Sequence, residues 1–135
     1  MDGKMTIAAI RYNNPGDVSL PIRGWTGGGK IVGLRGQPGY AQFPSMEIGY
    51  QAFLCRLQTY IDEGRNTIRK IGAVYATDPN WPKDVAQIAG LPIGVTLDPD
   101  DETQMQLLAS AIIRQETGMT LITLERKSKE YHHVT

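Results

Sequence analysis

The pattern of hydrophobic and polar residues changes near residue 44. Before that point, in residues 11–43, the chain carries more than half of its 15 glycines and three of its eight prolines, and its aromatic and β-branched residues come in short bursts. Such a stretch is typical of turns and hairpins rather than of a helix. It predicts three short strands, at 18–22, 30–34 and 40–43.

Beyond Pro44 the apolar residues recur at intervals of three and four, which predicts amphipathic helices. Ser45 is a suitable N-cap for the first helix, which is expected to end near Gly64. Three further helices follow: one from residue 66 or 67 to about 75, one from the segment 78–82 to Gly90, and one from the acidic segment 98–102 to Gly118.

The chain is expected to fold as one domain of the α+β class. Its 135 residues are enough for a single hydrophobic core and too few for two. A small glycine-rich β lobe at about 11–43 would pack on a helical lobe at about 45–118. Residues 119–135 are expected to form a strand at 120–124 and then a charged tail.

Charge and the composition of the chain ends exclude several classes of function. Fourteen Lys and Arg balance 14 Asp and Glu, and no nucleic-acid-binding motif is present, so no nucleic-acid partner is expected. The apolar run at residues 7–10 is too short for a signal peptide or a membrane span, which predicts synthesis in the cytoplasm without a signal peptide. Cys55 is the single cysteine, and His132 and His133 have no third ligand patterned nearby, so no metal site is predicted.

The turn at Asn13 and Asn14, followed by Pro-Gly, is a first candidate for binding. Two successive side-chain amides can face outward, each with a donor and an acceptor, and such groups suit a polyhydroxy or amide ligand. The alternative is that both amides bond only to their own turn.

Glu47 lies in the first turn of the helix that begins after Ser45. The exposed N–H groups at a helix N-terminus stabilise a carboxylate as the anion. That environment argues against a general acid, so Glu47 is interpreted as a structural or substrate-positioning residue.

Glu116 stands at the end of a strongly apolar helix, just before Gly118. The helix C-terminus carries partial negative charge, and apolar neighbours remove water, so both effects are expected to raise the pKa of this carboxyl. A protonated acid near neutral pH is what the cleavage of a glycosidic bond requires, because the leaving oxygen must be protonated. The alternative is an exposed residue of the last helical turn.

The segment Gln115-Glu116-Thr117-Gly118 resembles the catalytic Glu-Ser/Thr-Gly segment of lytic transglycosylases and of flagellar and autolysin-type glucosaminidases. In those glucosaminidases the glutamate segment is followed by an Asn-Asn turn, a Trp-Gly hairpin, an aromatic strand and a Ser-x-Glu helix start. The chain shows the later elements in the same order, as Asn13-Asn14, Trp25 with Gly27, Tyr40 with Phe43, Ser45 with Glu47, and then Tyr60. Since its glutamate comes near the C-terminus, the resemblance implies a circularly permuted lysozyme-like fold.

Over roughly residues 9–118 the chain is also similar to small phage and prophage proteins. They open with Arg-x-Asn-Asn-Pro-Gly, carry Asn-Thr-Ile-Arg in the middle and close with Arg-x-Glu-x-Gly, which here are residues 11–16, 66–69 and 114–118. The chain departs from them at Asp17, where they have Asn, and at residues 80–83, where they have a polar stretch.

The distribution of acidic residues favours a mechanism with a single acid. Between Asp17 and Glu47 there is no Asp or Glu, whereas Arg23, Lys30 and Arg35 make the lobe basic. A glycoside hydrolase uses a second carboxylate across the scissile bond, and only the edges of the lobe offer one, at Asp17 and Glu47. The resemblance to lytic transglycosylases implies instead that Glu116 alone protonates the leaving oxygen of the MurNAc–GlcNAc linkage of peptidoglycan, with no cofactor. A group of the sugar itself, as in a lytic transglycosylase, or a water, as in a muramidase, would then attack.

The predicted partner is the glycan strand of peptidoglycan, and the predicted place of action is the periplasm or cell wall. Stacking on sugar rings would fall to aromatic residues that could equally be core, namely Tyr12, Trp25, Tyr40 and Tyr50. Two alternatives stay open. One is a virion, tail or injection-machine component without activity that binds cell wall or partner proteins, and the other is an endopeptidase that cleaves the stem peptide.

Overall fold

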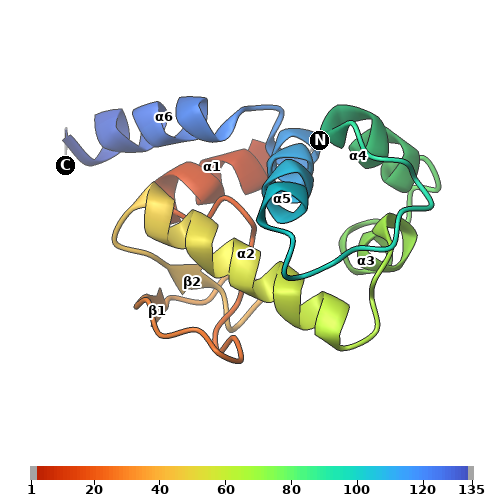
Figure 1. The fold of residues 1–135 in the computed structure, drawn as a ribbon. Helices are drawn as coiled ribbons and strands as arrows, with labels where there is room; N and C mark the ends of the chain where they lie inside the picture. The colour runs from red at the N-terminus through yellow and green to blue at the C-terminus, as the bar shows by residue number, and fades with distance from the viewer. Residues whose placement is uncertain (1–2, 134–135) are drawn as a thin grey trace.

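The computed structural model describes residues 3–133, which form six helices and one two-stranded antiparallel sheet (Figure 1). The elements in chain order are α1 Gly3–Tyr12, β1 Lys30–Ile31, β2 Ala41–Gln42, α2 Met46–Asp62, α3 Ile68–Tyr75, α4 Trp81–Ala89, α5 Glu102–Thr117 and α6 Leu121–His133. A mainly helical molecule with a small sheet confirms the α+β class at this coarse level. No helix in the described part of the chain is both long and apolar enough to cross a membrane.

The long helix α2 runs diagonally through the molecule (Figure 1). The sheet and its loops lie at one side of α2, and α3 and α4 lie at its far end. Helices α5 and α6 contact α2, and α1 packs against α5 and α6. The core forms where these elements meet, and its fully buried side chains include Phe53 and Leu57 from α2 and Leu108 and Ile112 from α5. Burying these apolar faces against each other is the main favourable term in the folding of the domain.

Local signals in the sequence account for the ends of several helices. The side chains of Ser45 and Thr67 cap α2 and α3, and the side chain of Asp101 accepts from the N–H of Gln104 at the start of α5. Gly118 adopts the left-handed conformation that ends α5. The predicted starts and ends of these helices are therefore confirmed.

The β lobe contains less regular sheet than expected. β1 and β2 have two residues each, paired as Lys30 with Gln42 and Ile31 with Ala41, and the predicted strand at 18–22 supplies only a bridge from Ser19 to Tyr40. Side chains replace the missing ladder. Three carbonyls of the predicted strand, those of Val18, Ser19 and Pro21, accept hydrogen bonds from the side chains of Asn14 and Arg56.

The prediction of a strand at 120–124 is wrong, because these residues begin helix α6. The Thr120 hydroxyl accepts from the N–H of Thr123 at 3.2 Å, as an N-cap does. Leu124 and Ser128 are buried on one face of α6, and this helix packs along α1. A tertiary surface therefore overrides the β preference of the Thr and Ile residues here.

Candidate active site

A cavity of about 330 Å³ opens between the loop that follows α1 and the helices α2, α3 and α5. This volume lies within the range of about 300–1,000 Å³ typical of ligand sites. Its walls come from the two ends of the chain and from its middle: Asp17, Val18, Ser19, Gln37, Arg56, Tyr60, Val74, Tyr75 and Glu116. Glu116 thus lies in a cleft between the lobe and the helices.

Glu116 is half-buried in the last turn of α5. Burial raises the pKa of its carboxyl above the ordinary value. The indole N–H of Trp81 opposes that rise, since it favours the charged form. This N–H is itself buried, and no partner in hydrogen-bond geometry meets it in the described part of the chain. Trp81 therefore influences the carboxylate from nearby without closing a hydrogen bond to it.

The end of α5 is held in place by its neighbours. The Thr117 hydroxyl donates to the Ile113 carbonyl at 2.7 Å and accepts from the N–H of Met119 at 3.1 Å. Thr6 of α1 donates to the Thr117 carbonyl at 3.1 Å. These bonds bring the first and fifth helices together beside Glu116, so the carboxyl has a defined position relative to the loop after α1.

Asp17 is the second carboxylate of the cavity. Its backbone adopts a left-handed φ of 56°, and its carbonyl accepts from the Gln37 amide at 3.1 Å. Burial, together with the negative charge of Glu116, raises the pKa of Asp17 to about 6. Two carboxylates from distant parts of the chain therefore share one partly dry space.

The sequence offers Asp17 and Glu47, at the edges of the lobe, as the only second carboxylates and favours a single acid. In the structure the loop after α1 folds back toward the end of α5, so that Asp17 lines the cavity with Glu116 and Glu47 does not. The signal that was available is the acidic residue directly after the Asn-Asn-Pro-Gly turn. Only the packing of α1 on α5 shows what that residue faces.

Tyr75 and Arg56 complete the cavity wall. Burial raises the pKa of the Tyr75 hydroxyl well above its ordinary value, and Tyr60, Asp17 and Glu116 add to the rise, so this hydroxyl stays protonated. The Tyr75 ring stacks on Trp81, with centroids 5.5 Å apart and planes inclined by 6°. The cavity thus contains a neutral hydroxyl donor beside its two carboxyls.

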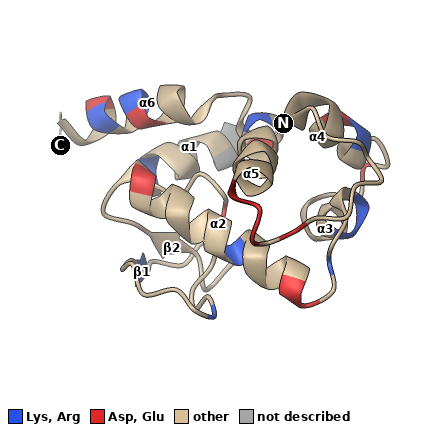
Figure 2. Ribbon diagram, viewed as in Figure 1, with Lys and Arg blue, Asp and Glu red and all other residues tan. Residues whose placement is uncertain are grey.

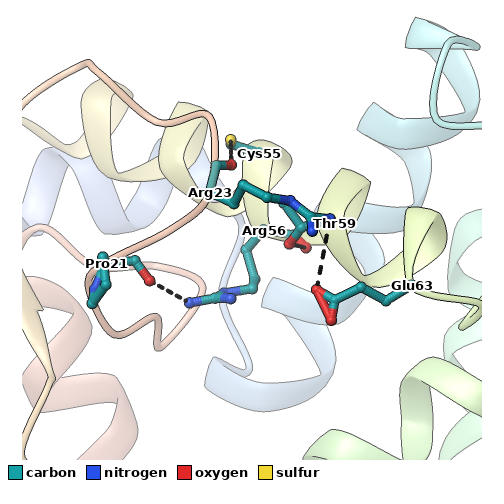
Figure 3. A network of polar contacts seen from close by, with 6 residues as sticks. All are labelled: Pro21, Arg23, Cys55, Arg56, Thr59 and Glu63. Atoms are coloured by element: carbon teal, nitrogen blue, oxygen red, sulfur yellow. Dashed lines mark hydrogen bonds and ion pairs between the residues drawn. The ribbon is translucent and has the colours of Figure 1, made fainter.

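Arg56 fastens the loop to α2. Its guanidinium donates to the carbonyls of Ser19 at 3.0 Å and Pro21 at 3.2 Å, and lies 5.5 Å from the centroid of the Tyr60 ring. Figure 3 shows Arg56 reaching Pro21, with the neighbouring Arg23 directed instead to Glu63. The cation is therefore occupied in holding the wall that follows Asp17.

Asn13 and Asn14 do not present their amides outward, and that expectation is wrong. Asn14 is 1% exposed, donates to the carbonyls of Val18 and Ala41 at 2.9 and 2.8 Å, and accepts from the N–H of Val18. Asn13 is buried as well, donating to the Phe43 carbonyl and accepting from the Ser128 hydroxyl of α6. Both amides hold the loop to its surroundings, because buried polar groups require partners.

The other residues singled out by the sequence analysis lie away from this cavity. Tyr40 is fully buried and meets the Tyr12 ring edge to face at 5.8 Å. Glu47 is exposed in the first turn of α2. Burial raises the pKa of the Tyr50 hydroxyl, and a hydrogen bond with Ser110 offsets part of that rise. The cavity that contains Glu116 is lined neither by these four residues nor by Trp25.

Trp25 lines a separate cavity of about 460 Å³ between α2 and the start of α5. Its indole N–H donates to the Gly28 carbonyl at 2.7 Å. The carboxylates that line this second cavity, Asp100 and Glu102, are exposed, and they belong to the acidic segment that precedes and opens α5 in Figure 2. It therefore lacks the buried, mutually influencing carboxyls of the first cavity.

The basic residues of the lobe are exposed rather than gathered into the cavity. Lys30 and Arg35 face solvent, and Arg23 approaches Glu63 at 4.0 Å on the surface. Within residues 3–133, no three His, Cys, Asp or Glu side chains come close enough together to hold a metal ion.

Comparison of the chain with protein-family models, with curated proteins and with solved structures finds no match.

Proposed function

We propose that this protein cleaves the glycan strand of peptidoglycan at the MurNAc–GlcNAc linkage, with Glu116 as the general acid. The observation that carries the proposal is the position of Glu116: half-buried, in a cavity between the lobe and the helices, with the pKa of its carboxyl raised by burial. A general acid needs a pKa near the working pH and access to the leaving oxygen, and this position supports both.

The rest of the cavity suits a carbohydrate. Ser19, Gln37, Tyr60 and Tyr75 are among the residues that line it, and hydroxyl and amide side chains of this kind pair with the hydroxyls of a sugar. Val74 and the Tyr75 ring add apolar surface, on which the C–H face of a sugar ring can pack. The exposed cations of the lobe would meet the carboxylates of lactyl groups and stem peptides.

The motifs at the two ends of the chain support the same assignment. The Arg-x-Asn-Asn-Pro-Gly and Arg-x-Glu-x-Gly segments resemble those of phage and prophage proteins. Glu116 of the second segment and Asp17, which directly follows the first, line one cavity. We therefore include a phage or prophage origin in the proposal, with action at the cell wall, as a virion component or after delivery by other proteins.

Clearing of purified sacculi tests the proposal. The protein should lower the turbidity of a sacculus suspension, and Glu116→Gln should abolish the effect because an amide cannot donate the proton. Glu130→Gln is the matched control, since Glu130 is exposed near the end of α6. Clearing that survives Glu116→Gln would refute the role of Glu116.

Mass analysis of the released material separates the remaining alternatives. Sugar fragments with intact stem peptides support the glycan-cleaving enzyme, whereas freed peptides would show an endopeptidase. Binding to sacculi with no release by the unmodified protein would show a virion or injection-machine protein that holds cell wall without cutting it.

A further inference from the structure

We propose that Asp17 is the second carboxylate of the reaction: it takes the proton of the attacking water, so that the glycan is hydrolysed to a reducing-end sugar instead of forming an anhydro ring. The inference rests on the proposed function and decides its mechanism. It reverses the single-acid mechanism expected from the sequence.

The geometry of the cavity carries the inference. Asp17 and Glu116 line the same space of about 330 Å³, one from the loop after α1 and the other from the last turn of α5. No hydrogen bond joins the two carboxyls in the described part of the chain, so they face a shared space without touching. Two carboxyls that line one cavity from different elements suit glycoside hydrolysis, in which an acid and a base act on the glycosidic bond and on a water.

The position of Asp17 is determined by its backbone and not by its carboxylate. Its left-handed φ of 56° follows the tight Asn-Asn-Pro-Gly turn, its carbonyl is held by Gln37, and the following segment is fastened by Arg56. No hydrogen bond or ion pair of the described residues ends on its carboxylate. The Asp17 carboxylate therefore makes no contact that holds the fold together. An asparagine at this position would adopt the same φ without bringing a second negative charge to the cavity.

The surroundings let the two carboxyls share one proton. Arg56 and Tyr60 of α2 and Tyr75 of α3 line the cavity with the two carboxyls. Trp81 of α4 affects the pKa of Glu116, and the charge of Asp17 affects the pKa of Tyr40. The charge of Glu116 is one cause of the raised pKa of Asp17, so a proton on Glu116 removes that cause. The reaction requires the state of the pair in which Glu116 carries the proton and Asp17 is the ionised base.

The reaction balances with this pair alone. Glu116 gives its proton to the glycosidic oxygen as the bond from that oxygen to the anomeric carbon breaks. Water forms the new bond to the anomeric carbon, and Asp17 receives the proton that this water loses. The pair ends with the proton on Asp17, and exchange with solvent returns it to Glu116. The products are two sugar chain ends, one of them a reducing end.

Isotope labelling of the product tests the inference. Sacculi are digested in water enriched in ¹⁸O, the fragments are reduced with borodeuteride, and their masses are measured. Hydrolysis places one solvent oxygen and one deuterium on each new reducing end. Anhydro products, which carry neither label, would overturn the role of Asp17 while leaving glycan cleavage by Glu116 intact. Sacculi that release no sugar fragments at all would instead overturn the proposed function.

Rate measurements on Asp17 variants are the second test of the inference. Asp17→Asn should lower the turnover rate by about 100-fold or more with little change in KM, and Asp17→Glu should restore part of it. Asp62→Asn is the matched control, because Asp62 is exposed at the end of α2. Circular dichroism and a thermal melt confirm that each variant is folded before its rate is compared.

The pH profile distinguishes a base from a merely structural residue. In Asp17→Asn the fall of the residual rate at acidic pH should disappear, because that fall reports the protonation of the base. Residual activity within threefold of the unmodified protein would overturn the inference. If instead the fall of the rate at alkaline pH disappeared in Asp17→Asn, the inference would also be overturned, because that fall reports the loss of the proton from the general acid and Asp17 would then be the acid.

Discussion

Asp17→Asn is expected to stabilise the folded protein at neutral pH. The folded structure raises the pKa of Asp17 from 3.8 to about 6, so it favours the protonated carboxyl over the charged one. Ionised Asp17 therefore costs stability. The cost is absent below the unfolded pKa, grows as the pH rises through the window between the two values, and is complete above about pH 6.

The size of the effect follows from the same two values. A rise from 3.8 to about 6, at about 1.36 kcal/mol for each pKa unit, gives an upper limit of about 3 kcal/mol. Water reaches part of the side chain and screens its charge, which reduces the expected gain to about 1–2 kcal/mol. For a chain of this length, that gain raises the Tm by roughly 4–8 °C.

Urea unfolding of both proteins at several pH values measures the effect. The difference in the free energy of unfolding between Asp17→Asn and the unmodified protein should be close to zero near about pH 3 and reach its full value above about pH 7. Asp62→Asn, which replaces an exposed carboxylate, should show no comparable pH dependence. Equal stability at neutral pH, or a less stable Asp17→Asn, would refute the reasoning.

Three further substitutions test other contacts. Trp81→Phe removes the indole N–H that favours the charged form, so the pKa of Glu116 should rise further in a ¹³C NMR titration; an unchanged or lower pKa would contradict this. Asn14→Ala removes three buried hydrogen bonds and should cost about 2–4 kcal/mol in urea unfolding, whereas a cost below about 1 kcal/mol would contradict their role. Gly49→Ala would place a Cβ 1.9 Å from a loop carbonyl oxygen and should cost at least about 2 kcal/mol, while the control Gly94→Ala meets nothing within 4 Å and should cost far less.

The helices that begin and end with their own capping residues are predictable from the sequence. Ser45, Thr67 and Gly118 act on backbone groups a few positions away, so the pattern around each contains the information needed. Helix α6 is different. Its Thr and Ile residues favour a strand, and only the surface that α1 offers to Leu124 and Ser128 makes the helix the better arrangement.

The candidate site also has features that the sequence predicts and features that it does not. The raised pKa of Glu116 is predictable, because an apolar helix removes water from a carboxyl near its end. The roles of Asn13 and Asn14 are not, because whether an amide faces solvent or the interior depends on which carbonyls of the β lobe and which α6 hydroxyl lie beside it.

The amino-acid sequence by itself determined the α+β class and the positions of α2 to α5, and it singled out Glu116 as the candidate general acid. Each of these depends on periodicity or on groups adjacent along the chain. Only the tertiary structure decided that Asp17 faces Glu116. Those two carboxyls meet because α1 packs against the end of α5 and Arg56 fastens the intervening loop to α2. Charges far apart along a chain influence each other only through distance in space, and that distance exists only after the helices have packed.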